Sequence, residues 1–329
     1  MRVLVTGASG MYGGGVARAL VERGDEVTVL QRRPAGVPGA LEVRGDITDP
    51  GALARAVAAQ DAIIHLAARV AVVGEWPEFE RINVHGTAAL IDAARHAGVG
   101  RFVFVSSPSV AHRGEALVGA RAEPADPDRA RGNYARSKAM AERIALAADR
   151  GPGQGMSVVA IRPHLVWGPG DTQLIGRIVE RARTGRLALI DQGAALIDTT
   201  YVDNAVEATV AAVDRCEDVH GRAFVISNGE PRPVREILTE VCRAAGVEPP
   251  RRRVPFRVAH AGGAAAEAVW RGLGREDDPP MTAFLAEQLA TAHWFDQRET
   301  MAALEWSPRV PLAEGFERLS RAYQDAAAP

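Results

Sequence analysis

The segment RVLVTGASGMYG, residues 2–13, decides the fold of this chain. An apolar run with strand character passes directly into a glycine-rich turn, and an alanine-rich helical stretch follows. Gly7 permits a tight turn, Gly10 lets backbone amides approach a pyrophosphate, and Gly13 allows the helix to pack closely on the strand. This order of elements is the context of a dinucleotide-binding site. We therefore predict cofactor contacts from Gly7, Ser9, Gly10, Met11, Tyr12 and Gly13.

Beyond this segment, short apolar strands alternate with alanine-rich helical stretches as far as residue 165. Such alternation favours a parallel sheet with right-handed crossovers, and we predict a doubly wound α/β fold of the Rossmann type. After residue 165 the regular alternation of strands and helices ends. We predict that residues 1–165 form the dinucleotide-binding domain, rejoined by residues 199–228. Residues 166–198 and 229–329 should form a smaller, mostly C-terminal substrate domain.

Composition excludes several classes of protein. The 329 residues are 47% hydrophobic and 24% charged, with a formal charge of −2, so no excess of positive charge predicts nucleic-acid binding. No stretch has the roughly 18 apolar residues of a membrane span. The apolar run at the N-terminus is too short for a signal peptide, so we expect a cytoplasmic protein. Cys216 and Cys242 lie far apart and outside metal-ligand spacing, so we expect reduced thiols and no metal site.

The end of the second predicted strand indicates which dinucleotide binds. Residues 30–33 read Leu-Gln-Arg-Arg, without the acidic side chain that holds the ribose 2′-hydroxyl of NAD. The guanidinium groups of Arg32 and Arg33 suit a 2′-phosphate instead. We predict a preference for NADP(H), with NAD(H) as the alternative if both arginines belong only to the surface.

A tyrosine and the single lysine of the chain predict the reaction chemistry. Tyr134 and Lys138 stand four residues apart on a predicted helix and therefore share one face. A nearby ammonium should lower the phenol pKa, normally near 10, and the compact amine can also reach a ribose hydroxyl. Ser107 follows a predicted strand whose carboxyl end should lie at the ligand-binding edge of the sheet. We predict that Ser107 and Tyr134 bind the substrate oxygen.

Seven motifs follow one another along the chain: TGASGMYG from Thr6, GDITD from Gly45, HLAA from His65, NVHGT from Asn83, the pair Ser106–Ser107, YARSK from Tyr134 and RPHLVWGPG from Arg162. Their order resembles that of the extended short-chain dehydrogenases/reductases, also called the epimerase/dehydratase family. The resemblance implies further residues around the cofactor: Asp46 and Ile47 flanking the adenine, Leu66, Ala67 and Ala68 lining the cleft, Asn83 supporting a proton relay, and Pro163 and His164 near the nicotinamide.

A narrower resemblance concerns the substrate. The stretch 162–171, with PMT at 280–282, HWFD at 293–296 and WSPRV at 306–310, is similar to the 3β-hydroxysteroid dehydrogenase branch. That branch includes bacterial reductases of 2-alkyl-3-oxoalkanoic acids. The resemblance implies hydride transfer between NADP(H) and a small hydrophobic β-keto or β-hydroxy substrate, either a long-chain acid or a sterol-like molecule. A nucleotide-sugar epimerase or dehydratase and a non-catalytic NADP(H) sensor are the alternatives, and a homodimer stays open.

One further segment bears on the substrate cleft. Val254–Leu273 carries apolar residues at helical spacing, which predicts an amphipathic helix with one apolar stripe that includes Val258 and Val269. That helix either packs on the sheet domain or walls a cleft beyond Tyr134, near Trp270 and Trp167. We expect the cleft to be lined mainly by apolar side chains. His65 ends a buried strand and is predicted to be a packed, hydrogen-bonded core histidine.

Overall fold

The computed structural model describes residues 1–71, 74–112, 114–273, 275 and 279–327. Its centre is a parallel seven-stranded sheet in the order β12-β7-β5-β4-β1-β2-β3. The strands are β1 (Arg2–Thr6), β2 (Glu26–Gln31), β3 (Leu41–Arg44), β4 (Ala62–His65), β5 (Arg101–Val105), β7 (Ser157–Pro163) and β12 (Ala223–Ile226). The strand order reverses between β1 and β4, which is where open sheets of this kind bind ligands.

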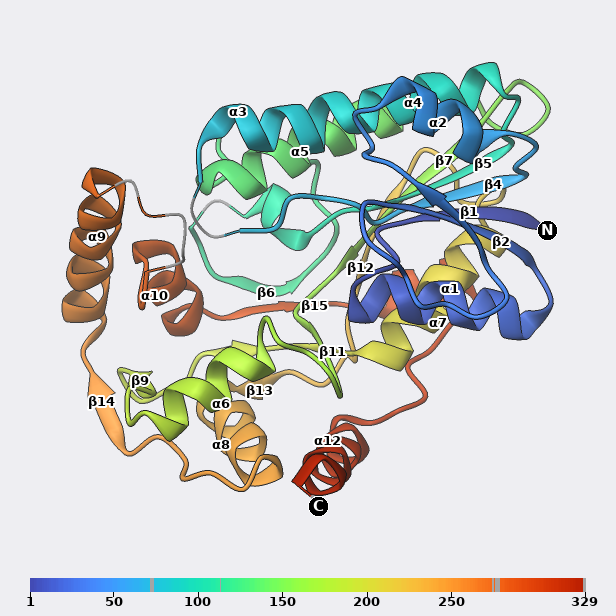
Figure 1. Ribbon diagram of the computed structural model, residues 1–329. Coiled ribbons are helices and arrows are strands. Elements are labelled where there is room, and N and C mark those ends of the chain that lie inside the picture. The colour runs from blue at the N-terminus through green and yellow to red at the C-terminus, as the bar shows by residue number, and fades with distance from the viewer. Residues whose placement is uncertain (72–73, 113, 274, 276–278, 328–329) are drawn as a thin grey trace.

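Helices cover both faces of this sheet (Figure 1). On one face lie α1 (Met11–Arg23) and α7 (Val202–Asp214), and on the other α2 (Pro50–Val57), α4 (Gly86–His96) and α5 (Gly132–Ala147). Alternate strand residues enter opposite cores because side chains of a strand alternate between faces. Val3 and Val5 pack in the core with α1, whereas Leu4 packs in the core with α2, α4 and α5. The doubly wound α/β fold is therefore confirmed.

The chain leaves the sheet domain after β7 and returns to it. The short strand pair β8 (Val166–Trp167) and β11 (Thr200–Tyr201) precedes α7, which packs on α1, and β12 then pairs with β7. Residues 199–228 thus lie against the first domain, although the domain boundaries themselves stay a prediction.

A smaller unit lies beside the carboxyl ends of the main strands. Its four-stranded sheet has the order β13-β10-β15-β6, and β14 pairs with β9. These strands are β6 (Leu117–Ala120), β9 (Ala188–Ile190), β10 (Leu196–Ile197), β13 (Arg232–Pro233), β14 (Arg252–Val254) and β15 (His293–Phe295). Its helices are α6 (Ile175–Arg183), α8 (Val234–Ala244), α9 (Phe256–Gly272), α10 (Ala283–Ala290), α11 (Arg298–Leu304) and α12 (Leu312–Ala327).

One hydrophobic core joins the two units. The cluster that contains Val3 and Val5 of β1 also contains Ile237 of α8 and Leu319 of α12. Trp167 is buried in it, stacks on Phe316 of α12 with ring centroids 4.6 Å apart, and donates its indole N–H to Thr199 Oγ1. Trp167 is therefore a core residue rather than part of a substrate cleft.

The predicted helix is present as α9, and it packs on α10 rather than on the sheet domain. Val258 is 60% exposed and Val269 is 51% exposed, so the apolar stripe faces outward. The buried residues of α9 are the small Ala259 and Gly263, and the helix packs on α10. A methyl group on Gly263 would lie 2.4 Å from the carbonyl carbon of Thr282, which explains why the inner face must be small.

The two cysteines are buried free thiols. Across the described residues, no helix combines the length and the apolar character that a membrane crossing requires. Within the same residues no cluster of three or more His, Cys, Asp or Glu side chains is arranged to hold a metal ion.

Candidate active site

The glycine turn between β1 and α1 is shaped to hold a phosphate group. A methyl group on Gly7 would lie 2.8 Å from the Ala67 nitrogen, and one on Gly13 would lie 2.4 Å from the Gly7 oxygen, so both positions require glycine. A methyl group on Gly10 would point into open space, because the Gly7 oxygen, 4.0 Å from it, is the nearest atom outside the adjoining residues. The helix that begins at Met11 has no side-chain cap and no acidic residue in its first turn. Its free amides therefore fit the pyrophosphate of a dinucleotide.

The other residues predicted from this turn divide into two groups. Ser9 is exposed beside Gly10. Met11 packs partly against the core, and the Tyr12 hydroxyl lies 2.5 Å from Thr209 Oγ1 of α7. The Tyr12 side chain thus fastens α1 to α7, which leaves its backbone amide as the group that can face a cofactor.

The residues after β4 form the wall opposite the glycine turn. Ala67 donates its backbone N–H to Thr6 Oγ1, and Leu66 donates to the Thr6 carbonyl. These bonds place Leu66 and Ala67 against Gly7, and Ala68 follows them in the chain. His65 is fully buried between Thr6 Oγ1 and Thr87 Oγ1, and burial lowers its pKa to about 3. His65 is the hydrogen-bonded core histidine that the sequence predicts.

The end of β2 places basic side chains where an adenosine ribose would lie. The Arg32 side chain is 73% exposed and reaches Asp46 only at 3.9 Å, and the described residues give Arg33 no partner. Gln31 occupies the end of the strand, and both polar atoms of its buried amide lack a partner among the described residues. Asp46 is held by Thr48, and Ile47 is buried beneath Gly86. No acidic side chain therefore stands at the end of β2.

Ser107 and Tyr134 meet at the carboxyl end of β5. Ser107 begins the 3-10 helix η2 (Pro108–Ala111), and its hydroxyl accepts the Ser109 N–H and contacts the Ser109 hydroxyl at 2.9 Å. Burial raises the pKa of Tyr134 to about 12, and a hydrogen bond with Ser107 partly offsets this. The prediction of a lowered phenol pKa is therefore wrong for the protein alone, because desolvation outweighs the neighbouring groups.

Lys138 is buried beneath Tyr134 on α5. Its Nζ donates to the Val105 carbonyl at 2.7 Å and lies 4.1 Å from the centre of the Phe104 ring. Burial lowers the pKa of Lys138 to about 7, against a smaller opposing effect of Glu142. The lysine thus contacts the end of β5, and a single hydrogen bond leaves at least one N–H donor for another group.

Asn83 lies in a π-helical turn, η1 (Glu80–His85), that continues into α4. Its side-chain oxygen accepts the Arg69 N–H, and its amide nitrogen donates to the Arg69 carbonyl and to Ser137 Oγ. These bonds fix the chain after β4 against α5. The part that Asn83 would play in a proton relay stays a prediction.

Pro163 and His164, predicted near the nicotinamide, point to different faces. Val159 and Ile161 of β7 pack with α1 and α7, and Pro163 continues that face. Arg162 faces the other way, where its Nε donates to Glu142 of α5 at 2.9 Å. By the same alternation, His164 belongs to the face of the sheet that α5 covers. The place of Pro163 and His164 near the nicotinamide stays a prediction.

Sequence reasoning missed the partners of His164. Its Nδ1 lies 2.5 Å from Asp198 Oδ1, although the two residues are 34 positions apart. Neither the composition nor the spacing around Asp198 distinguishes it from other loop aspartates. Ser109 was also missed, although its place two residues after Ser107 could have indicated a second hydroxyl at the same strand end.

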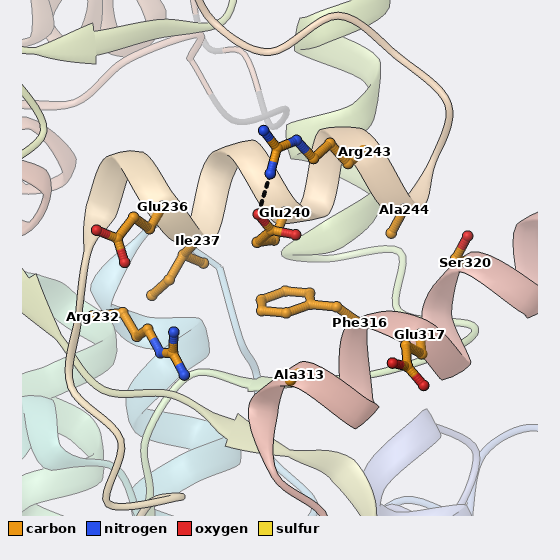
Figure 2. Close-up of a pocket in the computed structure, with 10 residues that line it drawn as sticks. All are labelled: Arg232, Glu236, Ile237, Glu240, Arg243, Ala244, Ala313, Phe316, Glu317 and Ser320. Atoms are coloured by element: carbon orange, nitrogen blue, oxygen red, sulfur yellow. Dashed lines mark hydrogen bonds and ion pairs between the residues drawn. The ribbon is translucent and has the colours of Figure 1, made fainter.

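A separate groove of about 550 Å³ opens between α8 and α12 (Figure 2). Phe316 lies across it opposite Ile237, and Arg243 bonds Glu240 at 2.7 Å on its rim. No candidate cofactor or catalytic residue is among those that line this groove. It is therefore distinct from the site at β1, β5 and β7, and the apolar lining expected beyond Tyr134 stays a prediction.

Comparison with known proteins places the chain in a family. Residues 3–227 match the NAD dependent epimerase/dehydratase family. A 2-alkyl-3-oxoalkanoate reductase of Stenotrophomonas maltophilia is 40% identical over 97% of this chain and 98% of its own length. A 3-beta-hydroxysteroid dehydrogenase of Mycolicibacterium neoaurum is 33% identical over 79% of this chain and 74% of its own.

The fold agrees with that placement. The structure of Thermus thermophilus UDP-glucose 4-epimerase in complex with NAD superposes with a TM-score of 0.74 at 26% identity, covering 99% of this chain and all of the other. The match spans both the sheet domain and the smaller unit. The chain is an oxidoreductase that belongs to the NAD-dependent epimerase/dehydratase family, the extended short-chain dehydrogenases/reductases.

Proposed function

We propose that this protein is an NADP(H)-preferring ketoreductase that reduces the 3-oxo group of a hydrophobic 2-alkyl-3-oxoalkanoate. The observation that carries the proposal is the buried Lys138, which lies one helical turn after Tyr134 on α5 and bonds the Val105 carbonyl at the end of β5, just before Ser107. The relative with 40% identity over nearly the whole chain is named for that reaction. The intact Ser–Tyr–Lys set also argues against a purely NADP(H)-sensing protein, which needs no proton donor.

The three side chains have separate roles. Ser107 and Tyr134 hydrogen-bond the ketone oxygen, and Tyr134 gives its proton to the oxygen as negative charge develops there. A phenol with a raised pKa stays protonated at neutral pH and is thus ready to act as the donor. Lys138 orients the site from below and has a donor left for a ribose hydroxyl. The bound nicotinamide cofactor supplies the hydride.

The preference for NADP(H) rests on the end of β2. Arg32 and Arg33 are available to a 2′-phosphate, and the position that NAD-binding sites give to an acidic side chain is Gln31. Each charge-assisted bond is worth about 1.5–3 kcal/mol. The double substitution Arg32→Ala with Arg33→Ala should weaken NADPH binding and leave NADH binding nearly unchanged. Arg95→Ala, which removes an exposed arginine of α4, is the control, and equal affinity of the wild type for both cofactors would refute the preference.

Turnover tests the catalytic assignment. The purified protein is assayed with NADPH and a racemic 2-alkyl-3-oxoalkanoate while absorbance at the nicotinamide band is followed. We expect reduction by the wild type, and a rate lower by roughly 10²- to 10⁴-fold for Tyr134→Phe with NADPH affinity retained. A Tyr134→Phe variant that turns over at the wild-type rate would exclude this tyrosine as the acid.

A sugar-nucleotide substrate is the second candidate, because solved relatives such as the Thermus epimerase have that specificity in their names. A diphosphate requires convergent basic side chains. The basic run that could serve, Arg251–Arg253, is exposed along β14 at the outer edge of the smaller unit (Figure 1). Turnover of a UDP-hexose in place of the oxo acid would favour this alternative.

A further inference from the structure

A buried carboxylate lies where the two units of the protein meet. Asp198 follows β10 and is fully buried. Its Oδ2 accepts the Ser227 hydroxyl at 2.7 Å and the Phe295 backbone N–H at 2.9 Å, and its Oδ1 lies 2.5 Å from His164 Nδ1. Three hydrogen bonds thus reach this carboxylate, as a buried polar group requires.

His164 is fixed in one orientation by its surroundings. Its backbone N–H donates to Ile226 and its carbonyl accepts the Thr200 hydroxyl. The ring stands edge-on to Phe295 and to His293, with centroids 5.2 and 5.1 Å away. The residue is 6% exposed. Asp198 therefore binds one end of a ring that cannot turn, which also fixes the direction of the other end.

The free end of this ring is Nε2. It has no hydrogen-bond partner among the described residues, and it is not one of their fully buried unpartnered polar atoms. Nε2 thus reaches the surface of an otherwise buried side chain. The neighbouring His293 bonds the Thr291 carbonyl through Nδ1, and burial lowers its pKa to about 4, so this ring is neutral at physiological pH. Of the two imidazoles, His164 is the one held by a carboxylate.

His164 lies next to the residues that would bind the ketone. β5 and β7 are neighbouring parallel strands, and Ser106 donates its N–H to Ile161. Strands in a sheet are about 4.8 Å apart, so Ser107 and His164, just beyond the two strand ends, are close neighbours. Both Tyr134 and Glu142, the partner of Arg162, lie on α5, and His164 continues the face of β7 that Arg162 presents to this helix.

We propose that His164, held by Asp198, binds the carboxylate of the substrate through Nε2 while Ser107 and Tyr134 bind its ketone oxygen. This rests on the function proposed above. In a 3-oxo acid, one carbon atom separates the carboxylate from the ketone carbon, so two adjacent donor sites at neighbouring strand ends match both groups. His164 is then a specificity-determining residue, and Asp198 is a positioning residue that fixes the direction of the imidazole.

The test compares an acid with its uncharged isostere. The 2-alkyl-3-oxoalkanoate and its primary amide have the same shape, but only the acid carries a negative charge. We expect the wild type to prefer the acid in kcat/KM by about 10- to 150-fold, the range of a charge-assisted hydrogen bond. If the wild type reduces neither compound, both proposals fail. If it reduces both equally well, only the carboxylate assignment fails.

Two variants then separate binding from structure. His164→Asn places an amide donor where Nδ1 bonded Asp198 and removes Nε2 with the rest of the ring, so kcat/KM should fall at least about 10-fold for the acid and little for the amide. Asp198→Asn keeps the shape and should reduce the same preference. His220→Asn is the matched control, because His220 bonds Asp149 at 2.8 Å in a partly exposed pair elsewhere. Equal losses of kcat/KM for the acid and the amide would show that His164 has a structural role alone.

Discussion

Lys138 shows at the scale of one residue why a chain rich in arginine retains one lysine. A guanidinium stays charged at any accessible pH, whereas an amine buried against Phe104 can lose its proton near neutrality. The four-residue spacing from Tyr134 was predictable because helix geometry is local. The pKa values of both residues were not, because they depend on burial by strands and loops far away in sequence.

The depressed pKa of Lys138 makes stability depend on pH. Between pH 7 and 10.5 the unfolded chain binds a proton at this amine that the folded protein does not, so the free energy of unfolding should rise with pH. Lys138→Met removes this contribution and leaves all other titrating groups in place. We expect the free energy of unfolding of the wild type, relative to that of the variant, to increase by up to about 1.4 kcal/mol per pH unit across that window. Denaturant titrations of both proteins at pH 7, 8 and 9 measure the difference, and parallel curves would contradict the prediction.

At the scale of elements, the glycine turn was predictable and α9 was not. Every requirement of the turn is set within β1 and α1, apart from the approach of Ala67 to Gly7. In α9, valine, alanine and glycine occupy all faces, and the pattern of apolar residues does not say which face a neighbour covers. The contact of Gly263 with Thr282 decides the orientation, and it comes from a helix that follows in the chain.

Two glycines of the turn should respond differently to a methyl group. Gly13→Ala brings its Cβ to 2.4 Å from the Gly7 oxygen, and we expect a loss of about 1–3 kcal/mol in the free energy of unfolding. Gly10→Ala meets no atom of the protein closer than 4.0 Å, so stability should be retained while dinucleotide affinity falls at least about tenfold. Thermal unfolding and cofactor titration of both variants give the comparison. A Gly10→Ala variant that binds cofactor normally would show that the pyrophosphate does not approach this residue.

For the whole molecule, the sequence predicted the sheet domain but not how the smaller unit attaches to it. The alternation of strands and helices extends through most of the first half, so local patterns suffice there. The hydrogen-bond partners of Asp198 lie just after β7, just after β12 and in β15, up to 97 residues away in sequence. Contacts at such separations leave no periodic signal in the chain.

The shared core implies that the two units unfold together. Residues from β1, α1, α8 and α12 belong to one buried cluster, so loss of either unit would expose that cluster, whereas the core around Leu4 lies within the sheet domain. We expect one transition in calorimetry, with the calorimetric and van't Hoff enthalpies in agreement. The tryptophan fluorescence, to which the buried Trp167 contributes, and the far-ultraviolet circular dichroism should change at the same temperature. Two separated transitions would show that the units are independent.

Because the chain has a single lysine, proteolysis at that residue can measure how often α5 opens. An endoproteinase that cuts only after lysine has one cleavage site here, in the middle of α5, and would produce fragments 1–138 and 139–329. Lys138 is 3% exposed, so the folded chain should resist the enzyme and be cut only when α5 opens. The rate at which one band becomes two on a gel therefore measures the opening of the catalytic helix itself, and a ligand that binds across Tyr134 and Lys138 should slow it.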